Sequence, residues 1–179
     1  MKALRFTRQF LRHPRQLGTV VESGRRLARR MAEEIDGSSR VIELGPGTGS
    51  VTVEILKRLP KNGRLTCFEI NAEFCRCLRE IQDPRLEVVN GDATQCERYV
   101  DEADCVVSGL PLALFGRREK ERVFELCERC GKYIQLQYTP VLGKEIRGYF
   151  GDVKLKFVPL NVPPAIVYVC KEARGDADR

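Results

Sequence analysis

The chain of 179 residues contains no long hydrophobic run. Its longest stretch without a charged residue, residues 157–170, holds 14 residues and three prolines, whereas a membrane-spanning helix needs about 20 apolar residues. The first residues also lack the apolar core of an export signal, because Arg5, Arg8 and Arg12 interrupt it. We therefore expect no transmembrane helix and no export, and we expect the protein to remain in the cytoplasm.

Acidic residues are scarce near the N-terminus. Residues 1–30 contain nine lysines and arginines but a single acid, Glu22, for a net charge of +8, and the remaining residues carry −2. Histidine is scarcer still, since His13 is the only one, so a base outside the first segment is not a histidine. A basic segment on a nearly neutral body predicts contact with a polyanionic surface, either a membrane or a nucleic acid.

Cysteine is plentiful, with eight residues, but a disulfide framework is not expected in a chain without an export signal. Cys67, Cys105 and Cys170 lie within apolar runs and are predicted to be small buried hydrophobic residues. Cys127 and Cys130 form a CxxC pair that lacks the second pair of ligands of a structural zinc site. We therefore expect no bound metal.

From residue 40 onward, short β-branched runs alternate with longer helical patterns, and no internal repeat is present. This order predicts one α/β domain with a mostly parallel, Rossmann-like sheet and helices on both faces. The last two runs are separated by only four residues, 161–164, so they form a hairpin and one strand is antiparallel. The expected strands are residues 40–44, 64–70, 86–90, 104–108, 133–138, 153–160 and 165–170; the expected helices are 51–59, 72–81, 94–100 and 117–129.

The segment before the sheet, residues 1–37, is predicted to form basic amphipathic helices. These helices would contact a membrane or cover the active site. The first of these has an apolar face and a basic face up to Pro14, which is typical of an interfacial helix, although such a helix can also pack on its own domain. A second helix over residues 24–35, with Ser23 as N-cap, buries one face. Residues 38–170 form the domain body, and residues 171–179 are expected to be a frayed tail. The faces consist of Ala3, Leu4, Phe6, Phe10 and Leu11 against Lys2, Arg5, Arg8 and Arg12 in the first helix, and of buried Leu27, Ala28, Met31 and Ile35 in the second.

The first expected strand leads into the sequence ELGPGTG, residues 43–49. Its alternating glycines let a ligand lie against bare main chain beside a helix N-terminus, at the edge of the sheet where α/β proteins bind ligands. Ser50 stands where a dinucleotide site has its third glycine, so NAD is the weaker interpretation. Glu69 ends the second strand, where a carboxylate accepts from ribose hydroxyls. Asp92 follows the third strand and either accepts from an adenine amino group or caps a helix.

With these features, residues 38–170 resemble the class I S-adenosylmethionine-dependent methyltransferases. The resemblance implies that the glycine loop holds the amino-acid part of S-adenosylmethionine, Glu69 its ribose and Asp92 its adenine. The residues it assigns to the cofactor are Glu43, Gly45, Pro46, Gly47, Thr48, Gly49, Glu69, Ile70, Asp92 and Ala93.

Within that superfamily the chain is more similar to the bacterial phospholipid N-methyltransferases. The similarity rests on residues 10–15, on residues 107–112 after the fourth strand, and on residues 161–165 in the final hairpin. It implies methylation of the phosphatidylethanolamine amine by an enzyme that is peripheral on the inner membrane surface. Its partners would be the phospholipid and the anionic membrane, which the N-terminal helix contacts.

The chain also resembles, more distantly, the ribosomal RNA adenine dimethyltransferases. Enzymes that methylate base amino groups typically carry Asn or Asp, then a proline pair or Leu-Pro, then an aromatic ring that stacks on the base. Residues 108–112 are SGLPL, without the polar group or the ring, and no helical RNA-binding domain follows Cys170. These departures disfavour nucleic acid, and an RNA adenine N6-methyltransferase or a cofactor-binding RNA-binding protein stays as the alternative.

For the acceptor amine, we expect backbone carbonyls around Ser108 and Leu110 to accept hydrogen bonds while Tyr138 orients it. Asn161 is expected at the same edge of the sheet. Leu110, Leu112 and Leu114 would form an apolar wall for the lipid. The number of methyl groups transferred and the oligomeric state are left open by the sequence.

Overall fold

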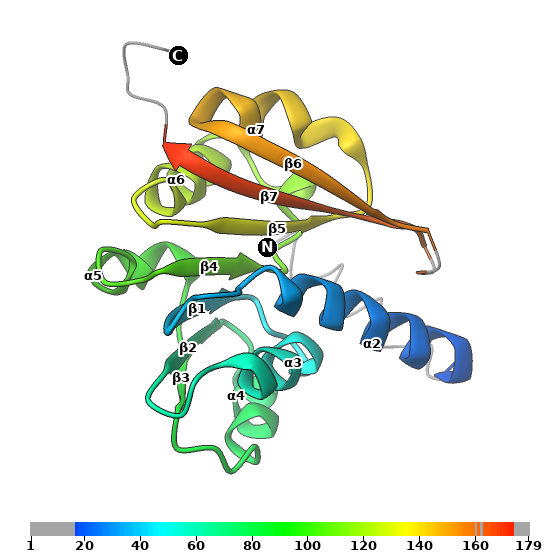
Figure 1. Ribbon diagram of the computed structural model, residues 1–179, viewed down its shortest axis with the longest axis vertical. Helices are drawn as coiled ribbons and strands as arrows, with labels where there is room; N and C mark the ends of the chain where they lie inside the picture. The colour runs from blue at the N-terminus through cyan, green and yellow to red at the C-terminus, as the bar shows by residue number, and fades with distance from the viewer. Residues whose placement is uncertain (1–16, 160, 162, 174–179) are drawn as a thin grey trace.

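The computed structural model describes residues 17–159, 161 and 163–173, and shows a seven-stranded sheet between two layers of helices (Figure 1). The strand order is β3-β2-β1-β4-β5-β7-β6, and β7 alone runs opposite in direction to the other six strands. The predicted fold class is confirmed. The strands are β1 (Arg40–Leu44), β2 (Arg64–Glu69), β3 (Leu86–Asn90), β4 (Cys105–Ser108), β5 (Tyr133–Gln137), β6 (Phe150–Val158) and β7 (Ala165–Ala173).

The helices of the described chain follow the predicted order with several differences at their ends. The α-helices are α2 (Leu17–Glu33), α3 (Ser50–Arg58), α4 (Ala72–Arg79), α5 (Glu97–Val100), α6 (Arg117–Cys127) and α7 (Gly143–Tyr149). Three short 3-10 helices are η2 (Ala93–Cys96), η3 (Leu112–Leu114) and η4 (Pro140–Leu142). None of the helices within the described residues is long and apolar enough to cross a bilayer.

The central strands β1, β2 and β4 are buried along almost their whole length, as expected for parallel strands covered on both faces. One face packs against α2 and α3, and the other against α5, α6 and α7. The edge strand β6 alternates between half-buried and exposed side chains. The first core cluster includes Leu27, Met31, Ile55, Leu56, Val41, Leu65 and Val167; the second includes Val100, Val123, Phe124, Ile146, Ile42, Val106 and Tyr168.

The N-terminal helix differs from the prediction at its start. Helix α2 begins at Leu17, so Ser23 lies inside it and is not the N-cap. Gly24 does not interrupt the helix, because an interior glycine costs only about 1 kcal/mol and the buried face stabilises the whole element. The predicted core residues Leu27, Ala28, Met31 and Ile35 are all buried. The first predicted helix lies outside the described residues.

The C-terminal half also departs from the prediction. Helix α7 was not predicted, because Gly143 and Gly148 weaken its helical pattern; burial of Ile146 anchors it. The helix expected over residues 94–100 is divided between η2 and α5. Strand β7 continues to Ala173, where Ala173 pairs with Phe150 on β6, so the expected tail begins later than residue 171.

The cysteines behave as small hydrophobic residues. All eight are free thiols, and Cys67, Cys105 and Cys170 are fully buried as predicted. Burial raises the pKa of the Cys130 thiol to about 11, and its Sγ donates to the Cys127 carbonyl at 2.8 Å. Within the described ranges no three histidine, cysteine or acidic side chains form a group that could hold a metal ion.

Candidate functional site

The predicted site residues meet at the carboxyl edge of the sheet. The backbone N–H of Gly47 in the glycine loop donates to Glu69 Oε2 at the end of β2, at 3.0 Å. The N–H of Gly91, after β3, donates to the carbonyl of Glu69 at 3.1 Å, and the N–H of Gly109, after β4, donates to the carbonyl of Leu44 at 2.9 Å. Four strand ends are therefore joined directly, as parallel strands require.

The three glycines of the loop have positive φ angles of 69°, 57° and 83° at Gly45, Gly47 and Gly49. Side chains would not fit at the outer two: an added Cβ would lie 2.8 Å from Leu110 at Gly45 and 2.9 Å from Leu78 at Gly49. At Gly47 nothing lies within 4 Å. The middle of the loop therefore presents bare main chain to open space, directly before the N-terminus of α3.

The other two loop residues have different surroundings. Pro46 is buried, and its carbonyl accepts the N–H of Gly49 at 3.1 Å, which closes the turn. Thr48 is exposed at the surface of the loop. Pro46 therefore shapes the loop, whereas Thr48 is free to face a ligand.

Glu69 is only 7 % exposed, yet both of its carboxylate oxygens are held by backbone donors. Gly47 N–H binds Oε2, and the N–H of Asn71 binds Oε1 at 2.8 Å. An ionised carboxylate offers about four acceptor positions, so two remain for the hydroxyls of a ribose. The two backbone bonds fix the carboxylate for that role.

Asp92, after β3, caps the 3-10 helix η2. Its Oδ1 accepts from both the N–H and the hydroxyl of Thr94, each at 2.7 Å. The capping alternative for this residue is thus realised, and the exposed carboxylate retains Oδ2 for a ligand. The neighbouring Ile70 is 58 % exposed at the end of β2, and Ala93 is half-buried at the start of η2.

Glu43 lies beneath the glycine loop and faces the protein interior. It is 2 % exposed, and its Oε2 accepts from Thr52 Oγ1 at 2.7 Å and from Cys67 Sγ at 3.3 Å. Burial raises the pKa of Glu43 to about 7, and the nearby charge of Glu69 adds to the effect. Its carboxyl group therefore supports the loop from below and is partly protonated near neutral pH.

The carbonyl proposed to receive the acceptor amine is already occupied. The Leu110 carbonyl accepts from the N–H of Leu112 at 2.8 Å, from Gln135 Nε2 at 3.1 Å and from Gln137 Nε2 at 3.4 Å, so both of its lone pairs are used. Ser108 is fully buried, and its hydroxyl accepts the Leu110 N–H at 3.3 Å. The Leu110 carbonyl and the Ser108 hydroxyl are therefore used to hold the loop, and binding of the amine by the other backbone carbonyls of residues 108–110 stays a prediction.

Two glutamines of β5 hold the acceptor loop and were not among the predicted site residues. Gln135 and Gln137 are buried, and they alternate with Ile134 and Leu136, so both face the loop after β4. Gln135 also accepts a short hydrogen bond from the Tyr133 hydroxyl. Two amides two residues apart in an otherwise apolar strand are the signal that could have identified them.

Tyr138 and Asn161 differ in whether their side chains are accessible to an acceptor. Tyr138 is 48 % exposed immediately after β5, and partial burial raises the pKa of its phenol. Asn161 is buried, and its Nδ2 donates to the carbonyl of Pro163 at 2.6 Å. Asn161 therefore shapes the hairpin rather than the site, whereas Tyr138 keeps the position predicted for it.

The apolar wall is also smaller than expected. Leu112 is fully buried in the core, so it does not line an open surface, while Leu114 is 47 % exposed and Leu110 half-buried. The short η3 helix turns Leu112 inward because the residue packs with the α6 side of the sheet.

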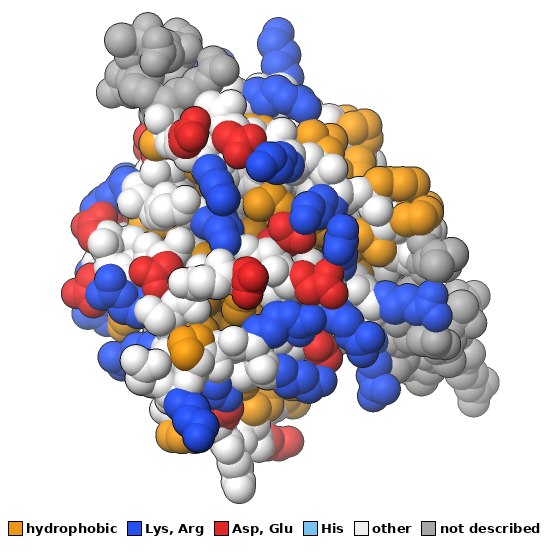
Figure 2. Space-filling view, viewed as in Figure 1, with side chains coloured by type: hydrophobic (Ala, Val, Ile, Leu, Met, Phe, Trp, Pro, Cys, Tyr) orange, Lys and Arg blue, Asp and Glu red, His pale blue; other side chains and the backbone are white. Residues whose placement is uncertain are grey.

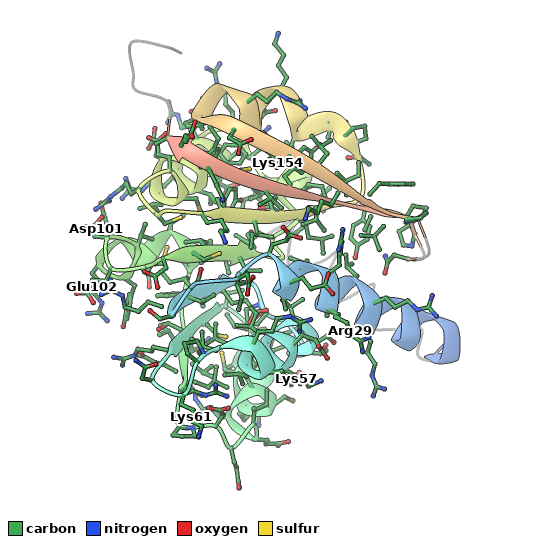
Figure 3. All side chains as sticks on the ribbon, viewed as in Figure 1. Arg29, Lys57, Lys61, Asp101, Glu102 and Lys154 are labelled. Atoms are coloured by element: carbon green, nitrogen blue, oxygen red, sulfur yellow. The ribbon has the colours of Figure 1, made fainter. Side chains whose placement is uncertain are left out.

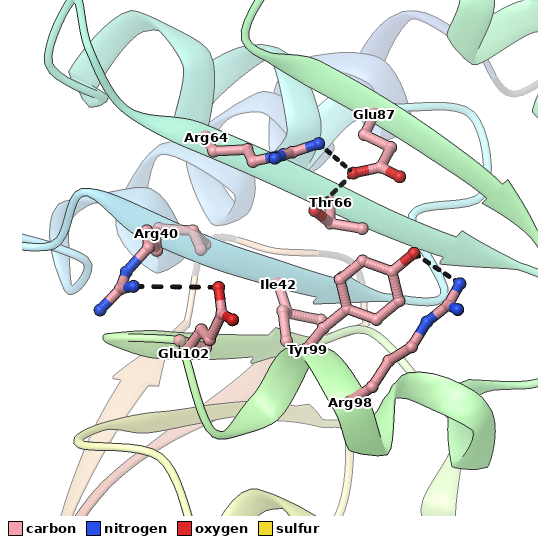
Figure 4. A pocket seen from close by; sticks show the side chains of 10 residues that line it. Arg40, Ile42, Arg64, Thr66, Glu87, Arg98, Tyr99 and Glu102 are labelled. Carbon is pink, nitrogen blue, oxygen red and sulfur yellow. Dashed lines mark hydrogen bonds and ion pairs between the residues drawn. The ribbon is translucent and has the colours of Figure 1, made fainter.

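A hollow of about 290 Å³ lies elsewhere, at the amino edge of β1 and β2 (Figure 4). Its charged side chains bind one another: Arg64 contacts Glu87 at 3.0 Å and Arg40 contacts Glu102 at 4.0 Å. Asp101 and Glu102 mark this end of the molecule (Figure 3). The hollow is thus lined by paired charges and is remote from the glycine loop.

Comparison with known proteins identifies the family. Residues 41–132 match the methyltransferase domain family. The chain belongs to this family. The methyltransferase is 31 % identical over 180 residues to an ornithine lipid N-methyltransferase of Singulisphaera acidiphila, covering 93 % of this chain and 94 % of that protein.

This methyltransferase is also similar to one ribosomal RNA methyltransferase and to one solved methyltransferase structure. A probable ribosomal RNA small subunit methyltransferase A of Pyrobaculum aerophilum is 30 % identical over 114 residues, which are 64 % of this chain and 43 % of that protein. A solved methyltransferase of Geobacter sulfurreducens has a TM-score of 0.62 at 16 % identity, over 96 % of this chain and 90 % of that one. The structural likeness shows the fold.

The cofactor of the methyltransferase is S-adenosylmethionine, as predicted. The residues present fit it: Gly47 offers open main chain, and the Glu69 carboxylate is fixed with free acceptor positions. When bound, the cofactor supplies an activated methyl group on a positively charged sulfur. The protein's part is to bind and orient it and to position the acceptor.

Proposed function

We propose that the methyltransferase acts on the amine of a membrane lipid headgroup, with phosphatidylethanolamine as the substrate. The observation that supports this most is the match to the ornithine lipid N-methyltransferase along 94 % of that protein's length. The ribosomal RNA relative is matched along only 43 % of its length. Ornithine lipid is the second substrate to test, because that relative's name specifies it.

The loop after β4 supports an aliphatic amine better than an adenine. A base amino group needs a side-chain acceptor and a stacking ring at this loop. Here Ser108 is buried and bound to Leu110, and Leu112, at the ring position, is buried in the core. An alkyl amine needs only a polar group and an apolar surface, and Tyr138 and Leu114 are exposed after β5 and β4 respectively.

Methyl transfer requires the neutral amine. An alkylammonium with a pKa near 10 is only about 0.1 % neutral at pH 7, a cost of roughly 4 kcal/mol. Because the pKa of Tyr138 is raised, its phenol stays protonated and acts by hydrogen bonding rather than as a base. We assign Tyr138 the orientation of the amine, and we assign its neutralisation to removal from water.

The lipid has to be reached at a surface. We propose that the protein is cytoplasmic and peripheral on the inner membrane, and that the N-terminal segment contacts anionic lipid, since residues 1–30 carry +8. The test is deletion of residues 1–13, which we expect to abolish binding to anionic vesicles while cofactor binding is kept. Equal co-sedimentation of both proteins would remove this role from the segment.

The substrate is tested by supplying labelled S-adenosylmethionine together with one acceptor at a time. The acceptors are vesicles with phosphatidylethanolamine, vesicles with ornithine lipid, and ribosomal RNA, with phosphatidylcholine vesicles as the control. We expect label in the aminolipid fraction alone. Label on adenine in RNA, with none in either lipid, would establish the RNA methyltransferase function instead.

A further inference from the structure

The outer end of the β6–β7 hairpin carries exposed hydrophobic side chains. Phe157 is 64 % exposed and Leu155 is 46 % exposed, both on the edge strand β6. Their register partners on β7 are Ile166 and Tyr168, which pack with the α6 and α7 side of the sheet. Because directly paired residues point to the same face, Phe157 and Leu155 extend that face beyond its helical cover.

A third exposed side chain lies close to this pair. Val141, in η4, is 64 % exposed, and the residue before it, Pro140, accepts a hydrogen bond from the Tyr168 hydroxyl at 3.4 Å. We call Val141, Leu155 and Phe157 the hairpin patch. Figure 2 shows hydrophobic side chains gathered at the upper right of this view, where Figure 1 shows α7 and the hairpin. Exposed apolar groups gathered in this way mark an interaction site.

The lysines near the hairpin patch differ in their surroundings. Residues 138–144 and 153–166 contain three lysines and no acid. Lys144 is exposed and makes no ion pair with any other described residue. Lys154 on β6 (Figure 3) lies 3.6 Å from Asp152, and Lys156 binds Glu34 at 2.6 Å. Both lysines alternate with Leu155 and Phe157 along the strand, so they face the other side of the sheet. The exposed apolar side chains, with the exposed cation of Lys144 close to Val141 in sequence, fit an anionic lipid surface.

The hairpin patch lies at the acceptor end of the molecule. Gln137 pairs with Ile166 at the start of β7, and the Gln137 amide binds the loop after β4. In Figure 1 the hairpin extends to the right, past the end of β4. The same end of the sheet therefore carries the acceptor loop and the exposed apolar side chains.

We propose that the hairpin patch inserts into the interfacial layer of an anionic bilayer and so sets the acceptor end of the enzyme against the membrane. The inference rests on the proposed lipid substrate. A strand from another protein fits this edge less well, because Lys154 and Lys156 on β6 are the kind of residue that protects an edge strand from pairing.

The absence of tryptophan from the chain provides a direct test. Phe157→Trp introduces a single reporter in the hairpin patch, and Glu102→Trp introduces one at the amino edge, where the Glu102 side chain is 76 % exposed. With phosphatidylglycerol vesicles, we expect a blue-shifted emission and quenching by brominated acyl chains for the first reporter only. Equal spectra with and without vesicles at position 157 would refute insertion.

A second measurement uses the double substitution Leu155→Ser with Phe157→Ser in the full chain. Removing two apolar contacts with the bilayer should weaken vesicle partitioning by about tenfold or more, while the melting temperature stays the same because both side chains are exposed. Unchanged partitioning, or loss of a dimer in sedimentation with partitioning intact, would show that the patch does not bind lipid.

Neither readout requires catalysis, so the two proposals fail separately. Quenching at position 157 without methylated lipid would refute the proposed function and leave the membrane contact in place. Methylated lipid without quenching at position 157 would refute the membrane contact of the hairpin patch and leave the proposed function in place.

Discussion

The two edges of the sheet use the same residue types in opposite ways. At the carboxyl edge, Glu69 is held by two backbone N–H donors and keeps acceptor positions for a ligand. At the amino edge, Glu87 and Glu102 are paired with Arg64 and Arg40. A carboxylate fixed by main-chain N–H groups, with acceptor positions left over, is therefore more informative about function than carboxylates that are paired with arginines in a hollow.

The direction of the helices explains part of this difference. The N-termini of α3 and α4 follow the carboxyl ends of β1 and β2, where free N–H groups and a positive dipole favour acidic groups and polar ligands. Their C-termini end in the basic residues Lys57, Arg58 and Arg79. The amino edge therefore gathers cations, which its own acids neutralise.

The largest expected effect concerns the pH dependence of stability at the carboxyl edge. The pKa of Glu43 rises from 4.5 to about 7 on folding, so its proton favours the folded state. Its contribution is fully present below pH 4.5 and is lost as the pH rises through 7, a change of about 3 kcal/mol. We therefore expect the difference in free energy of unfolding between Glu43→Gln and the wild type, measured in urea, to shift in favour of the variant between pH 5 and pH 8.

The amino edge supplies the control for this experiment. The Arg85 side chain hydrogen bonds to Asp83 and lowers the pKa of that carboxyl to about 2. Its contribution is present above pH 3.8 and is lost only as the pH falls toward 2. Asp83→Asn should thus change stability equally at pH 5 and pH 8; the same flat response in Glu43→Gln would mean that Glu43 is not protonated in the folded protein.

The next effect is on cofactor affinity. Glu69→Ala removes charge-assisted hydrogen bonds to the ribose, which are worth about 1.5–3 kcal/mol, so S-adenosylmethionine should bind roughly 10- to 150-fold more weakly. Glu87→Ala is the matched substitution at the amino edge and should leave the affinity unchanged. Isothermal calorimetry decides between them, and equal affinities for both variants would exclude Glu69 from the site.

A smaller effect is expected on the transfer rate. Gln137→Met removes one of the three hydrogen bonds to the Leu110 carbonyl and loosens the acceptor loop, at a cost near 1 kcal/mol for one hydrogen bond. We expect kcat to fall roughly fivefold, with S-adenosylmethionine affinity retained. Gln82→Met, at an exposed glutamine before β3, is the control. A loss of cofactor affinity in Gln137→Met would show that its effect is not confined to the acceptor side.

The smallest effect belongs to the amino edge. Arg40→Ala breaks two exposed contacts, at 4.0 Å with Glu102 and at 3.9 Å with Asp104, and exposed ion pairs contribute only about 0.2–1 kcal/mol each. Thermal unfolding should shift slightly, and both cofactor binding and methyl transfer should match the wild type. A marked loss of transfer in Arg40→Ala would give the hollow at the amino edge a function.

The cofactor side could be predicted from the sequence because its residues lie within one short segment or next to the end of a recognisable strand. The glycine loop is contiguous, and Glu69 and Asp92 each directly follow or end a strand whose position the β-branched pattern already marks. The expected strands 40–44 and 86–90 match β1 and β3 at both ends.

The acceptor side depends on contacts between distant residues. Gln137 reaches the Leu110 carbonyl across 27 positions of sequence, and only the register between β4 and β5 reveals that this carbonyl is occupied. Leu112 was expected at an open surface but turns inward with η3. Helix α7 escaped prediction because its packing around Ile146, rather than its own propensity, stabilises it.

Gly109 brings the main chain of the acceptor loop, after β4, into contact with the main chain of the cofactor loop, after β1. Its N–H binds the Leu44 carbonyl, and an added Cβ would lie 3.0 Å from the carbonyl oxygen of Gly45. The main chains of the cofactor loop and the acceptor loop thus touch with no side chain between them, so a shift of one displaces the other. If occupancy of the cofactor site changes affinity at the acceptor site through this contact, thermodynamic reciprocity requires the acceptor to change cofactor affinity by the same factor.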